Sequence, residues 1–331
     1  MKLTVAFIAI ALLVVGIVSL ETGKMAAPSP ALRIATSNTP LSAPLIIAQE
    51  KGYFVGQGLN IKLILAHGGV NCMNMLLRGD ADLATTSDSV AMFSRFERED
   101  FGVLASFAES DNDIKIMSLV QRQSLPLSAV ENSRVGVVES SASEFFVDAY
   151  LKMEGLDTQY VEKVSYQPQQ LGDALFNQKV DYISVWEPYG YTLSRDYPGR
   201  VFHFDTQGIN NLHFLLVHRN DDQGNITIPS KTIDNLVDAL DLANQFIHRE
   251  PERAREIVAD FLNLPNEQLT ALWPDYTFRL SLSDAMYLSL SMQANWAIAS
   301  GKVSKDVMPD YRGLFVHSPL LPSASLLQSS P

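Results

Sequence analysis

The feature that most constrains the fold of this chain is a recurring unit. In it a short apolar run leads, through a few small polar residues, into a segment with helical spacing. The clearest example spans residues 135–151, V-G-V-V-E-S-S-A-S-E-F-F-V-D-A-Y-L. Val135–Val138 is rich in β-branched residues and too short for a helix, which predicts a buried strand. Apolar residues then recur at helical spacing as far as Met153, and Gly155 provides a stop signal.

A strand that turns into a helix within a few residues points the free N–H groups of the helix toward whatever lies above the sheet edge. Ser140, Ser141 and Ser143 are therefore candidate ligand-binding residues. For Ser141 the alternative is a capping box with Glu144, in which the serine only caps the helix. Glu139 and Glu144 also place negative charge near this helix start. That charge would oppose a strongly anionic ligand unless a cation offsets it.

Three similar units follow one another near the N-terminus, with expected strands at Leu32–Ala35, Ile61–Leu65 and Asp80–Ala84. Each expected strand is followed by a polar loop and a helical segment. The loops after the second and third strands are expected at His67–Gly69 and Thr85–Ser89. Such alternation predicts an α/β fold, in which a parallel-rich sheet carries helices on both faces.

The pattern restarts after Pro126, and the apolar run Leu212–His218 predicts a strand that returns to the first lobe. From Ser230 onward the chain is expected to be mostly helical. We therefore expect two lobes joined by two crossings, near Val120 and near Gly208–Asn211, that act as a hinge. The expected boundaries are 1–30 for a signal peptide or N-terminal anchor with a linker, 31–120 and 210–315 for lobe 1, 121–209 for lobe 2, and 316–331 for an irregular tail.

Composition excludes several classes of protein. The chain of 331 residues is long enough to bury one large core or two medium ones, and its 47% of hydrophobic residues is typical of a globular protein. The net charge of −12 argues against a nucleic-acid partner and against a polybasic membrane-binding surface. The single cysteine, Cys72, excludes an intrachain disulfide and a cysteine-based zinc cluster.

No sequence pattern for a catalytic, metal or cofactor site is present. The six histidines form no H-x-x-x-H or H-E-x-x-H pattern. A nucleophile elbow, a phosphate-binding loop and a dinucleotide-binding glycine fingerprint are also missing from the sequence. We therefore expect no metal, no cofactor and no catalytic residues, and we interpret the chain as a protein that is not an enzyme.

Met1–Leu20 is the one targeting feature. Lys2 is a minimal positive region, and Leu3–Leu20 carries no charge, with a length between that of a signal-peptide core and a full membrane span. Either a signal peptidase cuts near Ala26 or Ala27, or the segment stays as an N-terminal anchor; export with cleavage is the favoured interpretation. We expect a periplasmic or other extracytoplasmic location, with membrane contact only through Leu3–Leu20 if it is uncleaved.

Ligands of open α/β sheets bind beyond the carboxyl ends of the strands. The polar residues after the first three expected strands are therefore candidate ligand-binding residues: Ser37, Asn38, Thr39, Gly68, Gly69, Ser87 and Asp88. Each has a simpler alternative. The residues of Ser37–Thr39 could cap the following helix, and Ser87 or Asp88 could be a plain N-cap. Gly68 and Gly69 could let backbone N–H groups approach a ligand closely, or could form only a tight turn.

Trp186 and Glu187 are the strongest candidates for ligand contact. They follow the expected strand Tyr182–Val185, where the indole can stack on a flat ligand or close over an apolar chain. The carboxylate of Glu187 can accept from an amine or a ring N–H. A core position is the alternative for Trp186, and it is the expected position for Trp296. The acidic segment Asp111–Asp113 is expected to be a solvated turn.

The sequence resembles the periplasmic substrate-binding proteins of ABC importers for nitrate, taurine, alkanesulfonates and thiamine-precursor pyrimidines. The resemblance covers about residues 32–301 and rests on several segments in combination: P-L-I-I-A at 44–48, K-G-Y-F at 51–54, G-L at 58–59, L-x-G-x-A-D at 77–82, V-G-V at 135–137 and W-E-P-Y at 186–189. It implies the two-lobed, type II periplasmic binding protein fold and places Trp186 at the cleft between the lobes. It also implies a monomer that binds a small-molecule ligand and whose partners are an ABC permease and its ATPase.

Ligand identity does not follow from the resemblance, because relatives bind chemically unlike molecules. A small nitrogen- or sulfur-containing organic solute or an oxyanion fits the family, whereas Asp88, Glu139 and Glu187 favour an amine-bearing, zwitterionic or aromatic nitrogen compound. Two alternative functions are a membrane-tethered ligand sensor, which needs an uncleaved leader, and a pyrimidine-precursor biosynthetic enzyme of the same fold. Such enzymes depend on a cysteine-rich motif that this chain lacks.

Overall fold

The computed structural model describes residues 31–120, 132–304, 307–315 and 318–320. Both β-sheets belong to the unit that begins at Leu32. The leader expected at residues 1–30 and most of the expected tail lie outside the described residues, so both stay predictions. Among the helices in the described part, none is long and apolar enough to cross a membrane.

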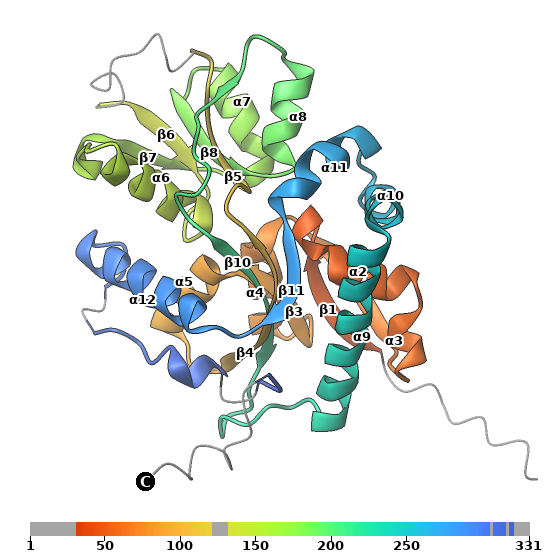
Figure 1. The fold of residues 1–331 in the computed structure, drawn as a ribbon. Helices are drawn as coiled ribbons and strands as arrows, with labels where there is room; N and C mark the ends of the chain where they lie inside the picture. The colour runs from red at the N-terminus through yellow and green to blue at the C-terminus, as the bar shows by residue number, and fades with distance from the viewer. Residues whose placement is uncertain (1–30, 121–131, 305–306, 316–317, 321–331) are drawn as a thin grey trace, which may run out of the picture. The chain divides into compact units, whose positions relative to one another are not determined.

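The first sheet has the strand order β11-β4-β10-β3-β1-β2 (Figure 1). β1 pairs in parallel with β2 and β3, whereas β10 runs antiparallel between β3 and β4. The three repeated strand–helix units thus form the parallel side of a mixed sheet, as expected. The strands are β1 (Leu32–Ser37), β2 (Ile61–Ala66), β3 (Leu83–Ser87), β4 (Phe101–Ser110), β10 (Leu212–Arg219) and β11 (Thr277–Ser281).

The second sheet has the order β7-β6-β8-β5-β9. β6 pairs in parallel with β7 and β8, and β5 lies antiparallel between β8 and β9. The strand expected at Val135–Val138 is therefore part of this sheet's parallel side. Its strands are β5 (Ile114–Ser118), β6 (Arg134–Val137), β7 (Glu162–Ser165), β8 (Tyr182–Trp186) and β9 (Phe202–His203).

The first crossing between the sheets lies between Ser110 and Ile114, so the crossing expected near Val120 is wrong. The error arises from β4, which the sequence pattern did not reveal as a strand. Small residues interrupt its apolar pattern. One of them, Gly102, packs so closely against His218 that an added Cβ would lie 2.5 Å from Nε2 of that histidine. The return crossing falls between His203 and Leu212. The other expected lobe boundaries stay predictions.

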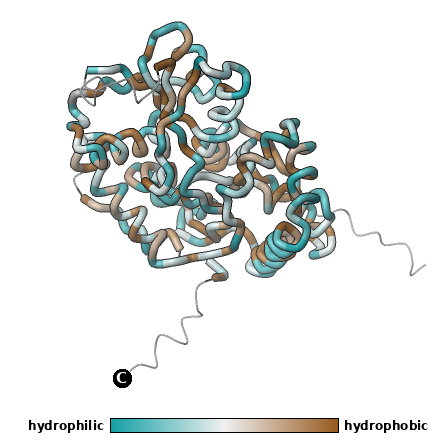
Figure 2. Tube along the Cα trace, turned by 45° about the horizontal axis from the view of Figure 1, so that its top comes forward, coloured by the Kyte–Doolittle hydropathy of each residue, from teal (hydrophilic) through white to brown (hydrophobic). Residues whose placement is uncertain are grey.

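Helices lie on both faces of the first sheet. The side chains of each strand alternate between the two faces, so apolar side chains on both faces pack against helices. Ile34 packs in the core that contains α2 and α9, and its neighbour Ala35 packs in the core that contains α4, α5 and α12. Along the tube in Figure 2, hydrophobic and hydrophilic positions alternate over short distances. The expected α/β class is confirmed.

The helices that cover the sheets in Figure 1 have the following bounds. They are α2 (Ala43–Glu50), α3 (Tyr53–Gly56), α4 (Gly68–Arg78), α5 (Asp88–Glu97), α6 (Ala142–Met153), α7 (Leu171–Phe176), α8 (Tyr189–Asp196), α9 (Ser230–Arg249), α10 (Pro251–Leu262), α11 (Asn266–Leu272) and α12 (Asp284–Ala299). Short 3₁₀ turns include η1 (Pro40–Ser42), η6 (Trp273–Asp275) and η7 (Arg312–Phe315).

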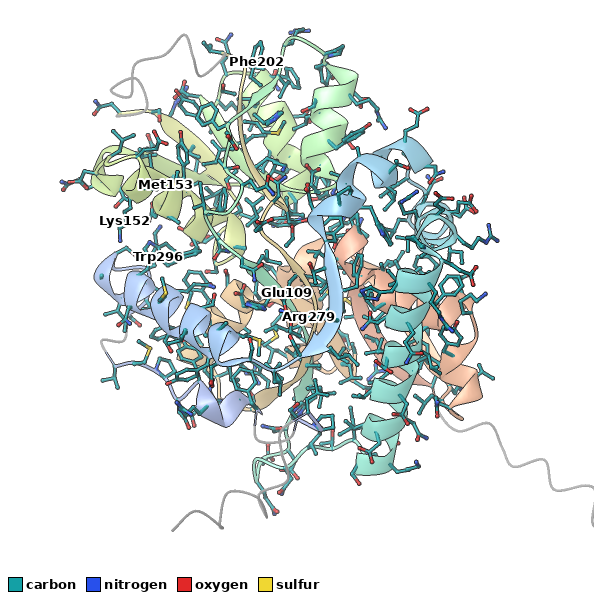
Figure 3. The ribbon with its side chains drawn as sticks, in the orientation of Figure 1. Glu109, Lys152, Met153, Phe202, Arg279 and Trp296 are labelled. Atoms are coloured by element: carbon teal, nitrogen blue, oxygen red, sulfur yellow. The ribbon has the colours of Figure 1, made fainter. Side chains whose placement is uncertain are left out.

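Trp296 on α12 connects α5, beside the first sheet, with α6, beside the second. Its ring makes edge contacts with Phe93 of α5 and Phe145 of α6, with centroids 5.8 and 5.1 Å apart. Its indole Nε1 donates to Oδ2 of Asp148 on α6 at 2.9 Å, and Nζ of Lys163 lies 2.5 Å from the other oxygen of that carboxylate. Figure 3 shows Trp296 on the side of α12 that is nearer to α6.

This arrangement predicts a large effect of the change Asp148→Ala. The change removes the acceptor of the Trp296 N–H and the partner of Lys163, whose side chain is only 10% exposed. We expect the free energy of unfolding to fall by about 3–5 kcal/mol, because a buried charge is left uncompensated. Urea unfolding measures the change. The control Asp238→Ala, on the exposed side of α9, should stay within about 0.5 kcal/mol of wild type; equal effects of the two changes would contradict the prediction.

Candidate functional site

A small cavity of about 30 Å³ lies where strand ends of the first sheet meet the start of α6 and the end of β8 from the second. By volume it holds about two water molecules. A larger solute therefore enters only if the two walls separate. The cavity is lined by Ser37, Thr39, Leu41, Gly68, Gly69, Val70, Ser87, Val90, Asp113, Ile114, Ser141, Ala142, Trp186, Leu212 and Phe214.

Many of the residues expected to bind a ligand are brought together at this cavity: Ser37, Thr39, Gly68, Gly69, Ser87, Ser141 and Trp186. Ser37 ends β1 and Ser87 ends β3, so both stand at the carboxyl ends of parallel strands. Ser141 is the N-cap of α6 and comes from the other wall. The repeated strand–turn–helix unit therefore does place polar groups around one space.

Two of the lining hydroxyl groups lack a hydrogen-bond partner among the described residues. Ser37 and Thr39 are 0% and 2% exposed, and neither Oγ of Ser37 nor Oγ1 of Thr39 is paired. Buried polar groups are nearly always hydrogen-bonded, and leaving one unpaired costs about 1–3 kcal/mol. Both groups are therefore open to a hydrogen-bond partner that enters the cavity.

Trp186 closes the cavity against the first turn of α4. An added Cβ on Gly68 would lie 2.7 Å from Cζ2 of the Trp186 indole, and Gly68 has a φ of +82°. Only glycine meets both conditions without strain, because it has no side chain and readily adopts positive φ. Gly68 and Gly69 were expected in a flexible loop, and that expectation is wrong, because α4 begins at Gly68.

Asp113 is the polar lining residue that sequence reasoning missed. It was expected in a solvated turn, yet it is 3% exposed and lines the cavity, whereas Asp111 is exposed as expected. The turn forms the first crossing between the sheets, and the backbone N–H of Glu187 donates to the carbonyl of Asp113 at 3.0 Å. The hydroxyl of Tyr276 donates to Oδ1 of Asp113 at 3.2 Å.

Burial raises the pKa of the Asp113 carboxyl to about 8, and the nearby negative charge of Glu187 adds to this effect. Tyr276 is held beside it because η6 leads into β11, which pairs with β4. An ion pair between Arg279 of β11 and Glu109 of β4, with Nη2 and Oε2 3.0 Å apart, joins the same two strands (Figure 3).

Glu187, a strong candidate from the sequence, does not line the cavity. It is 2% exposed, and its Oε2 accepts from the backbone N–H of Tyr191 in the first turn of α8. Burial raises the pKa of its carboxyl to about 7. The side chain therefore caps a helix that the sequence pattern did not reveal, and it affects the cavity through its closeness to Asp113.

Four further candidates, Asn38, Asp88, Ser140 and Ser143, also lie outside the lining. Oδ2 of Asp88 accepts from Ser289 and Gln293 of α12, and Oγ of Ser143 donates to the carbonyl of Ser184. Nδ2 of Asn38 lies 3.2 Å from Nδ1 of His67. Ser140 is exposed, and its backbone N–H donates to the carboxylate of Glu144.

Local structure accounts for the remaining differences from expectation. The prediction of a loop at Thr85–Ser89 is wrong, because β3 continues to Ser87 and α5 begins at Asp88. Ser87 and Ser141 are N-caps, with side chains that accept from the backbone N–H groups of Val90 and Ser143. Capping and cavity lining, which were alternatives in the sequence, occur together at both serines.

The tight contact at Gly68 predicts a stability effect of Gly68→Ala. The methyl group would clash with Trp186, and alanine is strained at this φ. We expect the free energy of unfolding to fall by about 2–4 kcal/mol. Urea unfolding followed by tryptophan fluorescence tests this. The matched control is Gly56→Ala, because nothing lies within 4 Å of its added Cβ; it should be neutral or slightly stabilising. A neutral Gly68→Ala would refute the geometry.

Asp113 predicts a pH dependence of stability. Its folded-state pKa of about 8 exceeds the ordinary value of about 3.9, so at intermediate pH the folded protein keeps a proton that the unfolded chain has lost. The resulting stability is full at low pH and is lost as pH rises toward 8. From pH 6 to 8, unfolding free energy should fall more steeply in wild type than in Asp113→Asn, by up to about 1.4 kcal/mol per pH unit. Urea titrations at each pH give both slopes, and parallel slopes would count against the buried acid.

Comparison with known proteins identifies the family of this chain. The family described as NMT1/THI5 like matches residues 39–254. No curated protein shows a significant sequence match. Among solved structures, the periplasmic aliphatic sulphonate binding protein SsuA from Escherichia coli is 17% identical with a TM-score of 0.71, over 89% of this chain and 94% of that chain.

Two other solved structures show the same fold. A Candida albicans protein with the generic periplasmic binding protein fold is 17% identical with a TM-score of 0.72, over 90% of this chain and 100% of that chain. The periplasmic nitrate-binding protein NrtA from Synechocystis PCC 6803 is 15% identical with a TM-score of 0.57, over 72% and 68%. The two-lobed periplasmic binding protein fold expected from the sequence is confirmed. Because the family match spans more than half of the chain, the protein belongs to the NMT1/THI5-like family.

Proposed function

We propose that this protein is the solute-binding component of an ABC importer and that it captures a small nitrogen- or sulfur-containing solute in the cavity between its two sheets. The observation that carries the proposal is the pair of unpartnered hydroxyl groups of Ser37 and Thr39 on the cavity wall. A bound solute supplies the hydrogen bonds that these buried groups lack. Its partners are then a permease and an ATPase, and the protein works as an exported monomer.

Family and fold support the same function. Solved proteins of this fold include one named for aliphatic sulphonates and one named for nitrate, both periplasmic binding proteins. At these low identities they support the mode of capture and leave the choice of solute to the cavity of this chain.

Capture follows from the size and position of the cavity. With room for about two water molecules, it admits a solute only when the walls separate at the two crossings between the sheets. A solute that contacts Thr39 on one wall and Ser141 on the other then favours an arrangement in which the walls close around it, because it binds that arrangement more tightly. The closed, loaded protein is the form that docks on the permease.

A catalytic role has less support than binding. Cys72 is the only cysteine, it is buried, and burial raises the pKa of its thiol to about 12. The thiolate is therefore scarce at neutral pH, which leaves Cys72 unsuited to nucleophilic or metal-binding work. The histidine, cysteine, aspartate and glutamate residues of the described part form no group of three or more that could hold a metal ion.

A thermal-shift screen of the purified protein tests the proposal. The compounds are nitrate, taurine, short alkanesulfonates, aminopyrimidines, riboflavin and amidines. We expect at least one to raise the unfolding midpoint, because a ligand that binds only the folded state stabilises it by mass action. Ser37→Ala should weaken binding of that compound about 3- to 10-fold, equal to one lost hydrogen bond, without lowering the midpoint of the free protein.

Ser106→Ala is the matched control. Ser106 is equally buried and its Oγ also has no partner among the described residues, but it lies on β4 outside the cavity lining. This change should leave binding intact. If no compound binds, or if the two serine variants bind alike, the proposed site is wrong. Retention of Leu3–Leu20 in protein made by an exporting host would instead favour the membrane-tethered sensor.

A further inference from the structure

The cavity wall contains a single ionisable side chain among the described residues, and that side chain is a carboxylic acid. Asp113 is this group; the rest of the lining is apolar side chains, glycines and hydroxyl groups. No lysine, arginine or histidine of the described part belongs to the lining. The three acids from which the sequence favoured a nitrogen compound, Asp88, Glu139 and Glu187, are not in the lining either. The charge preference of the cavity therefore depends on Asp113.

Helix starts commonly favour anions, and α4, α5 and α6 begin at this cavity. At α5 and α6, several of the first N–H groups are already occupied. At α5, the backbone N–H groups of Ser89 and Val90 donate to the side chains of Asp88 and Ser87. At α6, the N–H of Ser143 donates to Ser141, and the N–H of Ser140 donates to the carboxylate of Glu144. These donors are not free to bind the oxygens of a sulfonate or nitrate.

We infer that Asp113 contacts the ligand directly and that the cavity selects a solute with a cationic or N–H-donating nitrogen group, such as an amidinium or a protonated aromatic amine, over an oxyanion. This inference rests on the proposed function. The hydroxyl of Tyr276 orients the carboxyl through Oδ1. The apolar walls and the Trp186 indole cover the carbon skeleton of the ligand, and Ser37 and Thr39 accept or donate around its edge.

The surroundings of Asp113 give the two ligand classes opposite pH dependences. Glu187, Tyr276, Lys115 and Asp275 are the titratable groups that act on it. With a pKa of about 8 in the free protein, the carboxyl is mainly protonated at pH 6. A cation binds the ionised form, so its binding releases a proton and strengthens as pH rises toward 8. An oxyanion would accept a hydrogen bond from the protonated form, so its binding would weaken as pH rises through 8.

Pairs of ions with the same shape and opposite charge test the inference on the full chain. The pairs are guanidinium and nitrate, acetamidinium and acetate, and benzamidinium and benzoate. We expect at least one cation to raise the unfolding midpoint, and its partner anion not to. Titration calorimetry should show affinity for that cation rising up to 10-fold per pH unit from pH 6 to 8, with proton release on binding. These two measurements need no variant.

Asp113→Asn should weaken binding of the cation at least 10-fold at pH 8 and remove the pH dependence. Asp111→Asn is the matched control, since it removes an exposed carboxylate from the same turn, and it should bind as wild type does. Stronger binding of the anion in any pair, binding by none of the cations, or unchanged cation binding in Asp113→Asn overturns the inference. If an oxyanion binds and Ser37→Ala weakens it, the importer function stands and only the charge preference fails. If no compound of either screen binds, both fail.

Discussion

The structure depends on the antiparallel insertion of β10 between β3 and β4. This strand brings the chain back from the second sheet, and its pairing sets Leu212 opposite Ser110, the last residue of β4. The outgoing and returning crossings are therefore neighbours in one sheet, held by main-chain hydrogen bonds. Leu212 and Phe214 on the same strand line the cavity, so one pairing fixes both the crossings and the cavity wall beside them.

Some buried polar groups around this junction have hydrogen-bond partners, whereas others have none among the described residues. Asp88 is fully buried, and its carboxyl fastens α5 to α12. Glu187 is buried and caps α8. Ser37 and Thr39 are equally buried but unpaired among the described residues. Because an unpaired buried group is costly, its position carries more functional information than its residue type.

Sequence periodicity predicted much of the fold, because alternation of strands and amphipathic helices is a local property. It failed at β4, whose small residues give no strong apolar run, and at α8 and β11, which are short segments between stronger signals. Those failures moved the first crossing and hid the environment of Asp113. An acidic residue that follows Asp111 and Asn112 has the local signature of a solvated turn, and only long-range pairing buries it.

By itself, the sequence determined the α/β class, the two-lobe organisation implied by a strand that returns, and the set of small polar residues at strand ends that come together at one cavity. Tertiary structure decided which polar groups face that cavity and which are used elsewhere. The physical reason is that each hydroxyl or carboxyl group pairs with the donor or acceptor that lies within hydrogen-bond distance. The packing of distant segments decides which donor or acceptor that is. Asp113 lines the cavity and Glu187 caps a helix for that reason, although the local sequence suggested a solvated turn for Asp113 and ligand contact for Glu187.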